Sequence, residues 1–135
     1  MPKRILVDTN ILIDFSQGKR YARRFFAEAK EKYYEIILME EVYAQTKLLS
    51  GSRFDRVKLL IEELKSQDIY KRIGTDDKEK DCSEQLVKVC FEVVGQDIGE
   101  VDRRIIAVAK LRNLILFSND GNLKKVAKKE GINIL

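Results

Sequence analysis

The stretch ILVDTNILID, residues 5–14, places three apolar residues directly before an acid, a hydroxyl and an amide. Nothing polar alternates with Ile5, Leu6 and Val7, so the triplet predicts a short strand that is buried on both faces. Asp8 would then stand where this strand ends. Ligands of open parallel sheets bind at the carboxyl ends of the strands, so this position is compatible with a chemical role for the acid. A helix cap or a turn at Asp8 or Asn10 is the alternative.

Other apolar segments recur along the chain and alternate with helical patterns. The further predicted strands are EIIL (35–38), IYKRI (69–73), LILF (114–117) and INIL (132–135). Helical periodicity is expected over 18–34, 40–49, 53–67, 76–94, 97–113 and 121–131. Gly51 is expected to end the second of these helices, and Asp97 and Glu100 have capping-box spacing at the start of the fifth. Strands that alternate with helices imply right-handed crossovers. We therefore expect a single α/β domain over residues 1–135, a three-layer α/β/α sandwich with a central, mostly parallel sheet.

The composition limits the kinds of catalysis that the chain can support. The chain has no histidine, so neither a Ser-His-Asp nor a Cys-His nucleophile system can be built from it. Cys82 and Cys90 lie about two turns apart on one predicted helix, too far for a disulfide, and two thiols without histidine do not suit zinc. Any catalysis must then use carboxylates, amides, hydroxyls, basic residues or a metal, and hard oxygen ligands suit Mg²⁺ or Mn²⁺.

Charge and hydropathy bear on location and partners. No stretch approaches the roughly 20 apolar residues of a membrane span, and Asp8 interrupts the first apolar segment too early for a signal peptide. We expect a cytoplasmic protein without membrane contact. The net charge is +4, with basic ends and an acidic middle. This polarity suits a phosphate-rich partner held against acids through metal ions, and solvated helix faces are the alternative.

Three aspartates stand at positions that the predicted fold would bring together. Asp8 follows the first strand, Asp120 follows LILFSN (114–119), and Asp102 lies in the first turns of a helix that enters the same region. Neighbouring carboxylates raise one another's pKa, and a divalent cation removes that cost. This order of strand, acid, helix, acid, strand and acid predicts metal-assisted phosphoryl chemistry.

These motifs resemble those of the PIN domains, a family of metal-dependent ribonucleases that includes the VapC toxins of toxin–antitoxin pairs. The resemblance runs from ILVDTNILID through DRRIIAVA (102–109) to LILFSND (114–120). It implies that Asp8, Asp102 and Asp120 are metal ligands and that Asn10 and Ser118 support them. It further implies an endoribonuclease that hydrolyses RNA phosphodiester bonds with Mg²⁺ or Mn²⁺, a homodimer, and a small antitoxin partner.

One position departs from the family pattern. The family's second acid, a glutamate on the helix after the second strand, aligns with Gln45 in LMEEVYAQTKLL (38–49). Gln45 offers a carbonyl oxygen but no charge. Glu41, one helical turn earlier on the same face, is the substitute acid that periodicity favours, ahead of Glu40 and Glu100.

The missing acid leaves a second function open, a catalytically silent PIN-like module that binds RNA or protein. A receiver-like or flavodoxin-like domain with acids for phosphoryl relay is a third reading. It lacks support, because no pair of adjacent acids follows the first strand.

Overall fold

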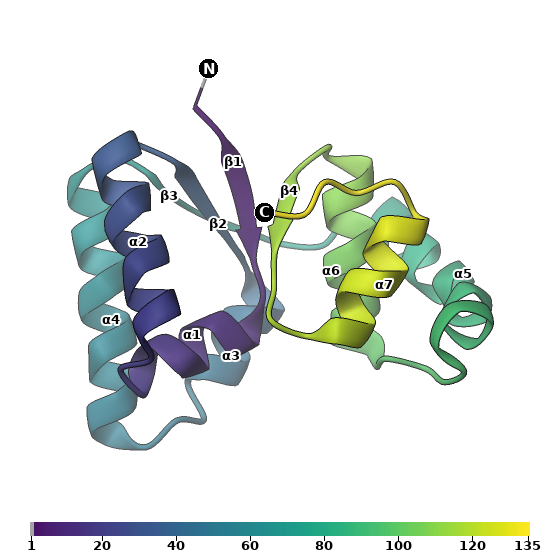
Figure 1. Cartoon of the computed structure of the whole chain (residues 1–135), viewed down its shortest axis with the longest axis horizontal. Coiled ribbons are helices and arrows are strands. Elements are labelled where there is room, and N and C mark those ends of the chain that lie inside the picture. The colour runs from purple at the N-terminus through teal and green to yellow at the C-terminus, as the bar shows by residue number, and fades with distance from the viewer. Residues whose placement is uncertain (1) are drawn as a thin grey trace.

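The computed structural model describes residues 2–135, which form a parallel sheet between two layers of helices (Figure 1). Its elements in chain order are β1 (Arg4–Val7), α1 (Thr9–Ser16), α2 (Arg20–Lys32), β2 (Glu35–Met39), α3 (Glu40–Thr46), α4 (Gly51–Ser66), β3 (Tyr70–Ile73), α5 (Asp77–Val94), α6 (Glu100–Leu111), β4 (Ile115–Phe117) and α7 (Gly121–Lys129).

The four strands have the order β3-β2-β1-β4 and all neighbours are parallel. Leu6 of β1 pairs with Ile37 on one side and with Leu116 on the other. Ile5, Leu6 and Val7 are fully buried, as the unbroken apolar triplet predicts. The α/β/α expectation is confirmed. The expected last strand, residues 132–135, is reduced to a single parallel bridge between Leu116 and Ile134.

The helices divide between the two faces of the sheet. On one face α1 packs against α2, α3 and α4, and on the other α5, α6 and α7 pack together (Figure 1). The apolar face of α2 illustrates how the helices pack. Residues at helical spacing on this face are buried in the common core: Ala22, Phe25, Phe26 and Ala29.

Two local expectations were wrong, and one helix was not predicted. The unpredicted helix is α1, Thr9–Ser16. The Asp8 side chain caps it by accepting a hydrogen bond from the Thr9 N–H, which is the cap that remained open as an alternative for this residue. Gly51 begins α4 and does not end α3. The capping box belongs to α5, where Asp76 and Glu79 cap each other's backbone N–H groups, whereas Asp97 is bound to Arg103.

The structure also bears on the state of the two cysteines and on the presence of membrane-spanning helices. Cys82 and Cys90 are both free thiols, Cys90 buried and Cys82 partly so. Within residues 2–135, none of the helices combines the length and the apolar character that crossing a membrane requires.

Candidate active site

The site forms where β1 and β4 end side by side. The Asp8 N–H donates to the Phe117 carbonyl at 3.1 Å, which continues the pairing of the two strands by one residue. Asp8 is only 3% exposed, and both of its carboxylate oxygens accept hydrogen bonds. Oδ1 accepts from the Thr9 N–H at 2.7 Å and Oδ2 from the Ser118 hydroxyl at 2.8 Å. The first acid is therefore fixed by residues from both strand ends.

Asp120 is joined to Asp8 through Ser118. Its N–H donates to the Ser118 Oγ at 3.0 Å, so one hydroxyl serves both acids. The Asp120 Oδ1 caps α7 by accepting from the N–H groups of Asn122 and Leu123 at 3.0 and 3.2 Å. Ser118, 5% exposed, therefore positions the two acids, in keeping with the supporting role that the resemblance implies.

Asp102 lies in the first turn of α6, in the layer formed by α5, α6 and α7. It faces Asp8 across a hollow of about 380 Å³. We call it the acid hollow; its lining residues are Asp8, Thr9, Asn10, Ile13, Gln45, Leu48 and Asp102. Burial, together with the charges of Asp8 and Asp120, raises the pKa of Asp102 to about 7. Burial and the charge of Asp120 also raise the pKa of Asp8, although the hydrogen bonds from Ser118 and Thr9 oppose that rise. The three acids are thus close enough to repel one another.

Helix α3 brings Gln45 to the same hollow. The Gln45 Oε1 accepts a hydrogen bond from the Thr9 hydroxyl at 2.7 Å, which turns the amide toward the end of β1. Asn10, on α1, is exposed at the rim of the hollow. Two of the predicted polar residues therefore lie beside the acids.

Glu41 lies elsewhere. Its Oε2 accepts from the Thr75 hydroxyl at 2.6 Å and from Arg104 at 3.3 Å, beside a separate hollow that Glu40 also lines. Arg104 holds Glu100 as well, at 2.6 Å. Burial alone would raise the pKa of Glu41, but these partners bring it below its usual value. The structure does not bring Glu41 or Glu100 into the acid hollow.

A family model for the PIN domain matches residues 5–129. The chain belongs to the PIN domain family. Members of this family are typically nucleases, and they generally use divalent metal ions. The three motifs that suggested the resemblance lie within the matched residues, and their acids meet at one edge of the sheet.

Solved structures share the fold of this PIN domain at low identity. VapBC2 from Rickettsia felis, bound to a DNA fragment from its promoter, has 14% identity over 98% of this chain and 97% of that chain, with a TM-score of 0.68. VapBC-1 from nontypeable Haemophilus influenzae has 14% identity over 98% and 96%, with a TM-score of 0.69. A domain of a functionally unknown protein from Methanocaldococcus jannaschii has 24% identity over 98% and 89%, with a TM-score of 0.62. No curated protein matches this sequence.

The acids of this PIN domain fit a divalent cation in chemistry but are not arranged around one. Within residues 2–135, no three acidic or thiol side chains are already grouped as a cation site. Asp120 is turned toward α7, yet only its Oδ1 is used there. Among residues 2–135, no side chain donates a hydrogen bond to the Asp102 carboxylate or pairs with it. An oxygen-rich set with unrelieved repulsion suits Mg²⁺ or Mn²⁺, which Asp8, Asp102 and Asp120 would hold after side-chain adjustment.

A second polar cluster beside the acids was not foreseen. Asp14 of α1, 7% exposed, accepts a hydrogen bond from the Tyr21 hydroxyl and pairs with Lys19 at 3.1 Å. The Asn119 amide approaches the same carboxylate at 3.5 Å, and Asn119 lies between Ser118 and Asp120. The cluster ties the acid-bearing loop to α1 and α2. Because no helix was predicted over 9–16, the sequence alone did not place Asp14 one helical turn after Asn10, near the acids.

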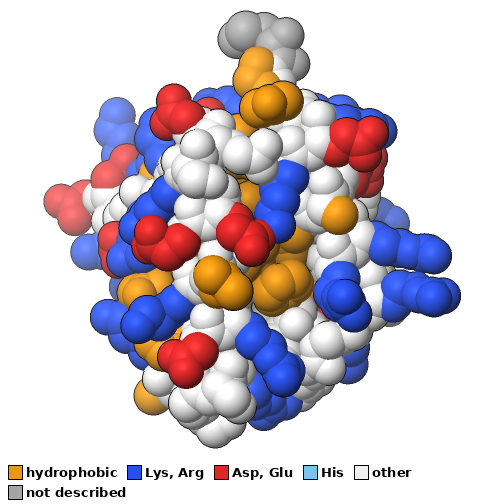
Figure 2. All heavy atoms as spheres, turned by 90° about the vertical axis from the view of Figure 1, so that its left-hand side faces the viewer, with side chains coloured by type: hydrophobic (Ala, Val, Ile, Leu, Met, Phe, Trp, Pro, Cys, Tyr) orange, Lys and Arg blue, Asp and Glu red, His pale blue; other side chains and the backbone are white. Residues whose placement is uncertain are grey.

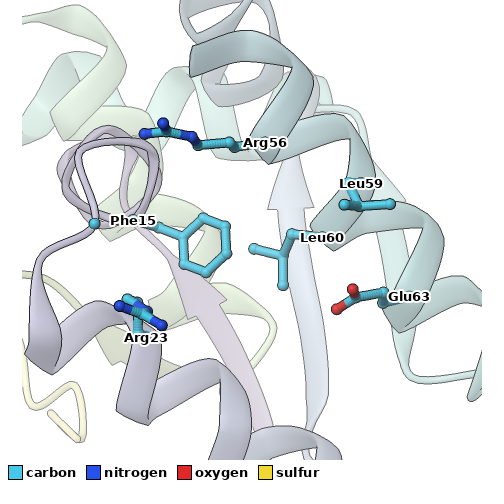
Figure 3. A pocket seen from close by; sticks show the side chains of 7 residues that line it. Phe15, Arg23, Arg56, Leu59, Leu60 and Glu63 are labelled. Carbon is cyan, nitrogen blue, oxygen red and sulfur yellow. The ribbon is translucent and has the colours of Figure 1, made fainter. Parts of the chain in front are cut away.

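Another hollow of about 380 Å³ lies between α1, α2 and α4 (Figure 3). Phe15 and Leu60 point into it, and Arg23, Arg56 and Glu63 stand around it. Figure 2 looks onto this side of the molecule and shows hydrophobic side chains at the bottom of a depression with charged side chains around it. Its one acid, Glu63, pairs with Lys30, so this hollow has no acid cluster for phosphoryl chemistry.

Proposed function

We propose that this PIN domain is a divalent-metal-dependent endoribonuclease, the toxin of a toxin–antitoxin pair that acts in the cytoplasm. The observation that carries the proposal is the meeting of Asp8, Asp102 and Asp120 at the ends of two strands and the start of a helix. There burial and the charges of Asp8 and Asp120 raise the pKa of Asp102, and burial and the charge of Asp120 raise the pKa of Asp8. Such repulsion lowers the stability of the fold, so packing alone does not account for these three acids. A cation that binds phosphate at the same place supplies a reason.

Each residue of the site has a defined task in this proposal. A bound Mg²⁺ or Mn²⁺ would supply a Lewis acid and offset the charge of the RNA phosphate. Asp8 would be the most rigid ligand, because Thr9 and Ser118 fix both of its oxygens. Gln45, oriented by Thr9, would add a neutral oxygen. Ile13 and Leu48 give the acid hollow an apolar side that a ribose or base can contact.

We further propose that the chain forms a homodimer and is held inactive by a small antitoxin protein. Structures with a similar fold support the antitoxin partner. They include VapBC complexes from Rickettsia felis and Salmonella typhimurium, each described as bound to DNA, and a toxin–antitoxin complex from Klebsiella pneumoniae.

The test of the nuclease proposal is the substitution Asp8→Asn, assayed on single-stranded RNA with Mn²⁺ or Mg²⁺. Asparagine keeps the shape of the side chain and can still accept from the Thr9 N–H, so the fold should persist while cleavage falls at least about a hundredfold. Asp81→Asn, on the exposed face of α5, is the matched control and should cut RNA normally. Equal cleavage by the wild type and Asp8→Asn would defeat the proposal.

Gln45 supports one alternative, a silent PIN domain that binds RNA or protein without cutting. The neutral amide stands where the family places an acid, and the structure does not bring Glu41 to replace it. Under this alternative the wild type would bind its partner and show no metal-dependent cleavage.

A further inference from the structure

Three arginines near the start of α2 have no carboxylate partner. Arg20, Arg23 and Arg24 are exposed and form no ion pair with any of residues 2–135. The other cations around this helix do have partners: Lys19 pairs with Asp14, Lys30 with Glu63, and Lys32 with Glu28. Figure 2 shows exposed Lys and Arg side chains on both sides of the face that carries α2 and α4. The three guanidinium groups are available to an anionic partner.

This placement is unfavourable for the helix itself. Arg20 and Arg24 are four residues apart on one face and repel each other, and cations near a helix N-terminus oppose the helix dipole. No acid lies in the first turn of α2 to compensate. The buried rings of Phe25 and Phe26 stabilise the helix instead. The arginines therefore point to a function other than stability.

Arg20 and Arg24 border a hollow of about 570 Å³ between α2 and the end of β4, which we call the α2–β4 hollow. Its one acid, Glu28, is paired with Lys32, and Leu135 completes the lining. Tyr21 and Phe117 give it partly exposed rings, and Phe25 stacks on Phe117 beneath with ring centroids 4.1 Å apart. The volume is in the range of small-molecule sites. Two arginines beside aromatic rings offer both contacts that a nucleotide uses, charge for the phosphate and a flat face for the base.

The α2–β4 hollow adjoins the acids through β4. The carbonyl of Phe117 accepts the hydrogen bond from the Asp8 N–H at 3.1 Å, and the next residue, Ser118, holds the Asp8 carboxylate. On the other wall, Tyr21 donates to Asp14, which Asn119 also approaches. A nucleic-acid strand in this hollow would therefore reach the acid site within the span of the loop that carries Ser118 and Asp120.

We propose that the α2–β4 hollow is a nucleotide subsite that binds the RNA strand next to the scissile phosphate. Arg20 and Arg24 contact backbone phosphates, and the rings of Tyr21 and Phe117 contact a base. The inference rests on the proposed function, since it takes single-stranded RNA as the substrate. It assigns substrate binding to a surface separate from the three aspartates.

The experiment measures binding apart from cleavage. A labelled single-stranded RNA oligonucleotide is titrated by fluorescence anisotropy with the full chain carrying Asp8→Asn, in EDTA, with and without Arg20→Gln/Arg24→Gln. We expect the Kd to rise about tenfold and the slope of log Kd against log salt to fall by roughly 1.4, for two single-strand phosphate contacts. Lys128→Gln/Lys129→Gln removes the same charge at the far end of α7 from Asp120 and should change the Kd less than twofold. In the cleaving parent, the arginine substitutions should raise KM and leave kcat within twofold.

The outcomes separate this inference from the nuclease proposal. RNA cleavage by the wild type together with unchanged binding in the arginine variant would overturn the subsite alone. Binding that depends on Arg20 and Arg24 in a protein that cuts no RNA would support the subsite and refute the nuclease. Equal losses in the arginine and lysine variants would show a general charge effect and overturn the subsite. Competition by an acidic protein but not by RNA would assign the surface to a protein partner and overturn it as well.

Discussion

The single residue Asp102 makes the stability of the fold depend on pH. Its pKa is about 7 in the folded chain, against an ordinary value of 3.8. As pH rises from 4 to 7, the unfolded chain loses this proton while the folded chain keeps it, so the contribution of Asp102 to stability falls across that window. Above pH 7 the full cost of an ionised, half-buried carboxylate is present.

Replacing Asp102 with Asn should therefore stabilise the metal-free protein at high pH only. In EDTA we expect Asp102→Asn to raise the free energy of unfolding by on the order of 2 kcal/mol at pH 8, discounted for partial solvent exposure, and to leave it nearly unchanged at pH 4. Urea unfolding at both pH values measures the difference. Asp55→Asn, an exposed acid on α4, should show no such gain. A gain of equal size at both pH values would contradict the repulsion among the acids.

Under the proposed function, Gln45 would limit how strongly the acid hollow holds a cation, because its side chain carries no charge. In Gln45→Glu the new carboxylate can still accept from the Thr9 hydroxyl, and it adds a negative charge at the same place. We expect the Mn²⁺ concentration for half-maximal cleavage to fall several-fold, measured as the rate of RNA cutting against added metal. The exposed Gln85→Glu on α5 is the control. Activity that appears only in Gln45→Glu, from an inactive parent, would favour the silent module.

At the scale of elements, a buried ion pair joins α5 to the end of α6. Glu79 is 1% exposed, and Arg112 holds both of its oxygens, with Nε at 2.6 Å and the second guanidinium nitrogen at 2.8 Å. Arg112→Met would leave a buried carboxylate without its partner, and we expect a loss of about 3–5 kcal/mol in the free energy of unfolding.

The double variant Arg112→Met/Glu79→Gln provides the control for this prediction. Glutamine is neutral and can still accept from the Asp76 N–H through Oε1, so most of the stability should return. If denaturant unfolding shows a loss below 1 kcal/mol for Arg112→Met, or no recovery in the double variant, the pair does not anchor α5 to α6.

The elements also show which parts of the fold the sequence reveals. The strands at residues 5–7, 35–38 and 114–117 could be predicted because each contains an uninterrupted apolar run, which is typical of a strand buried on both faces. Helix α1 was missed because Thr9, Ile11 and Ile13 are β-branched and weaken the helical signal, and packing of α1 on α2, α3 and α4 overrides that preference. The capping box was misplaced because Asp97 has the right spacing but a stronger partner in Arg103.

The sequence also predicts part of the acid site. Asp8 and Asp120 follow strand ends, so topology alone brings them to one edge of the sheet. The position of Glu41 was not predictable, because periodicity places it on the face of Gln45 but cannot show that Arg104 and Thr75 would engage it. The Asp14 and Tyr21 cluster stayed hidden for the same reason, since it needs contacts among α1, α2 and the loop after β4.

At the scale of the whole molecule, the site is a product of the parallel sheet. Asp8 follows β1, an inner strand of the sheet, and Asp120 follows β4, the edge strand beside it. Asp102 comes from α6 in one helical layer, and Gln45 comes from α3 in the other (Figure 1). No element holds the site alone. The arrangement of these side chains therefore depends on the packing of both layers. Under the proposed function, its chemistry would also require a bound cation.

The most direct test of that dependence is anomalous diffraction from a crystal of the full chain soaked in Mn²⁺. The account predicts an anomalous peak between Asp8, Asp102 and Asp120, with the Asp120 Oδ2 turned toward the ion and no such peak in Asp8→Asn. A fully soaked crystal with the three carboxylates unchanged and no manganese between them would contradict it.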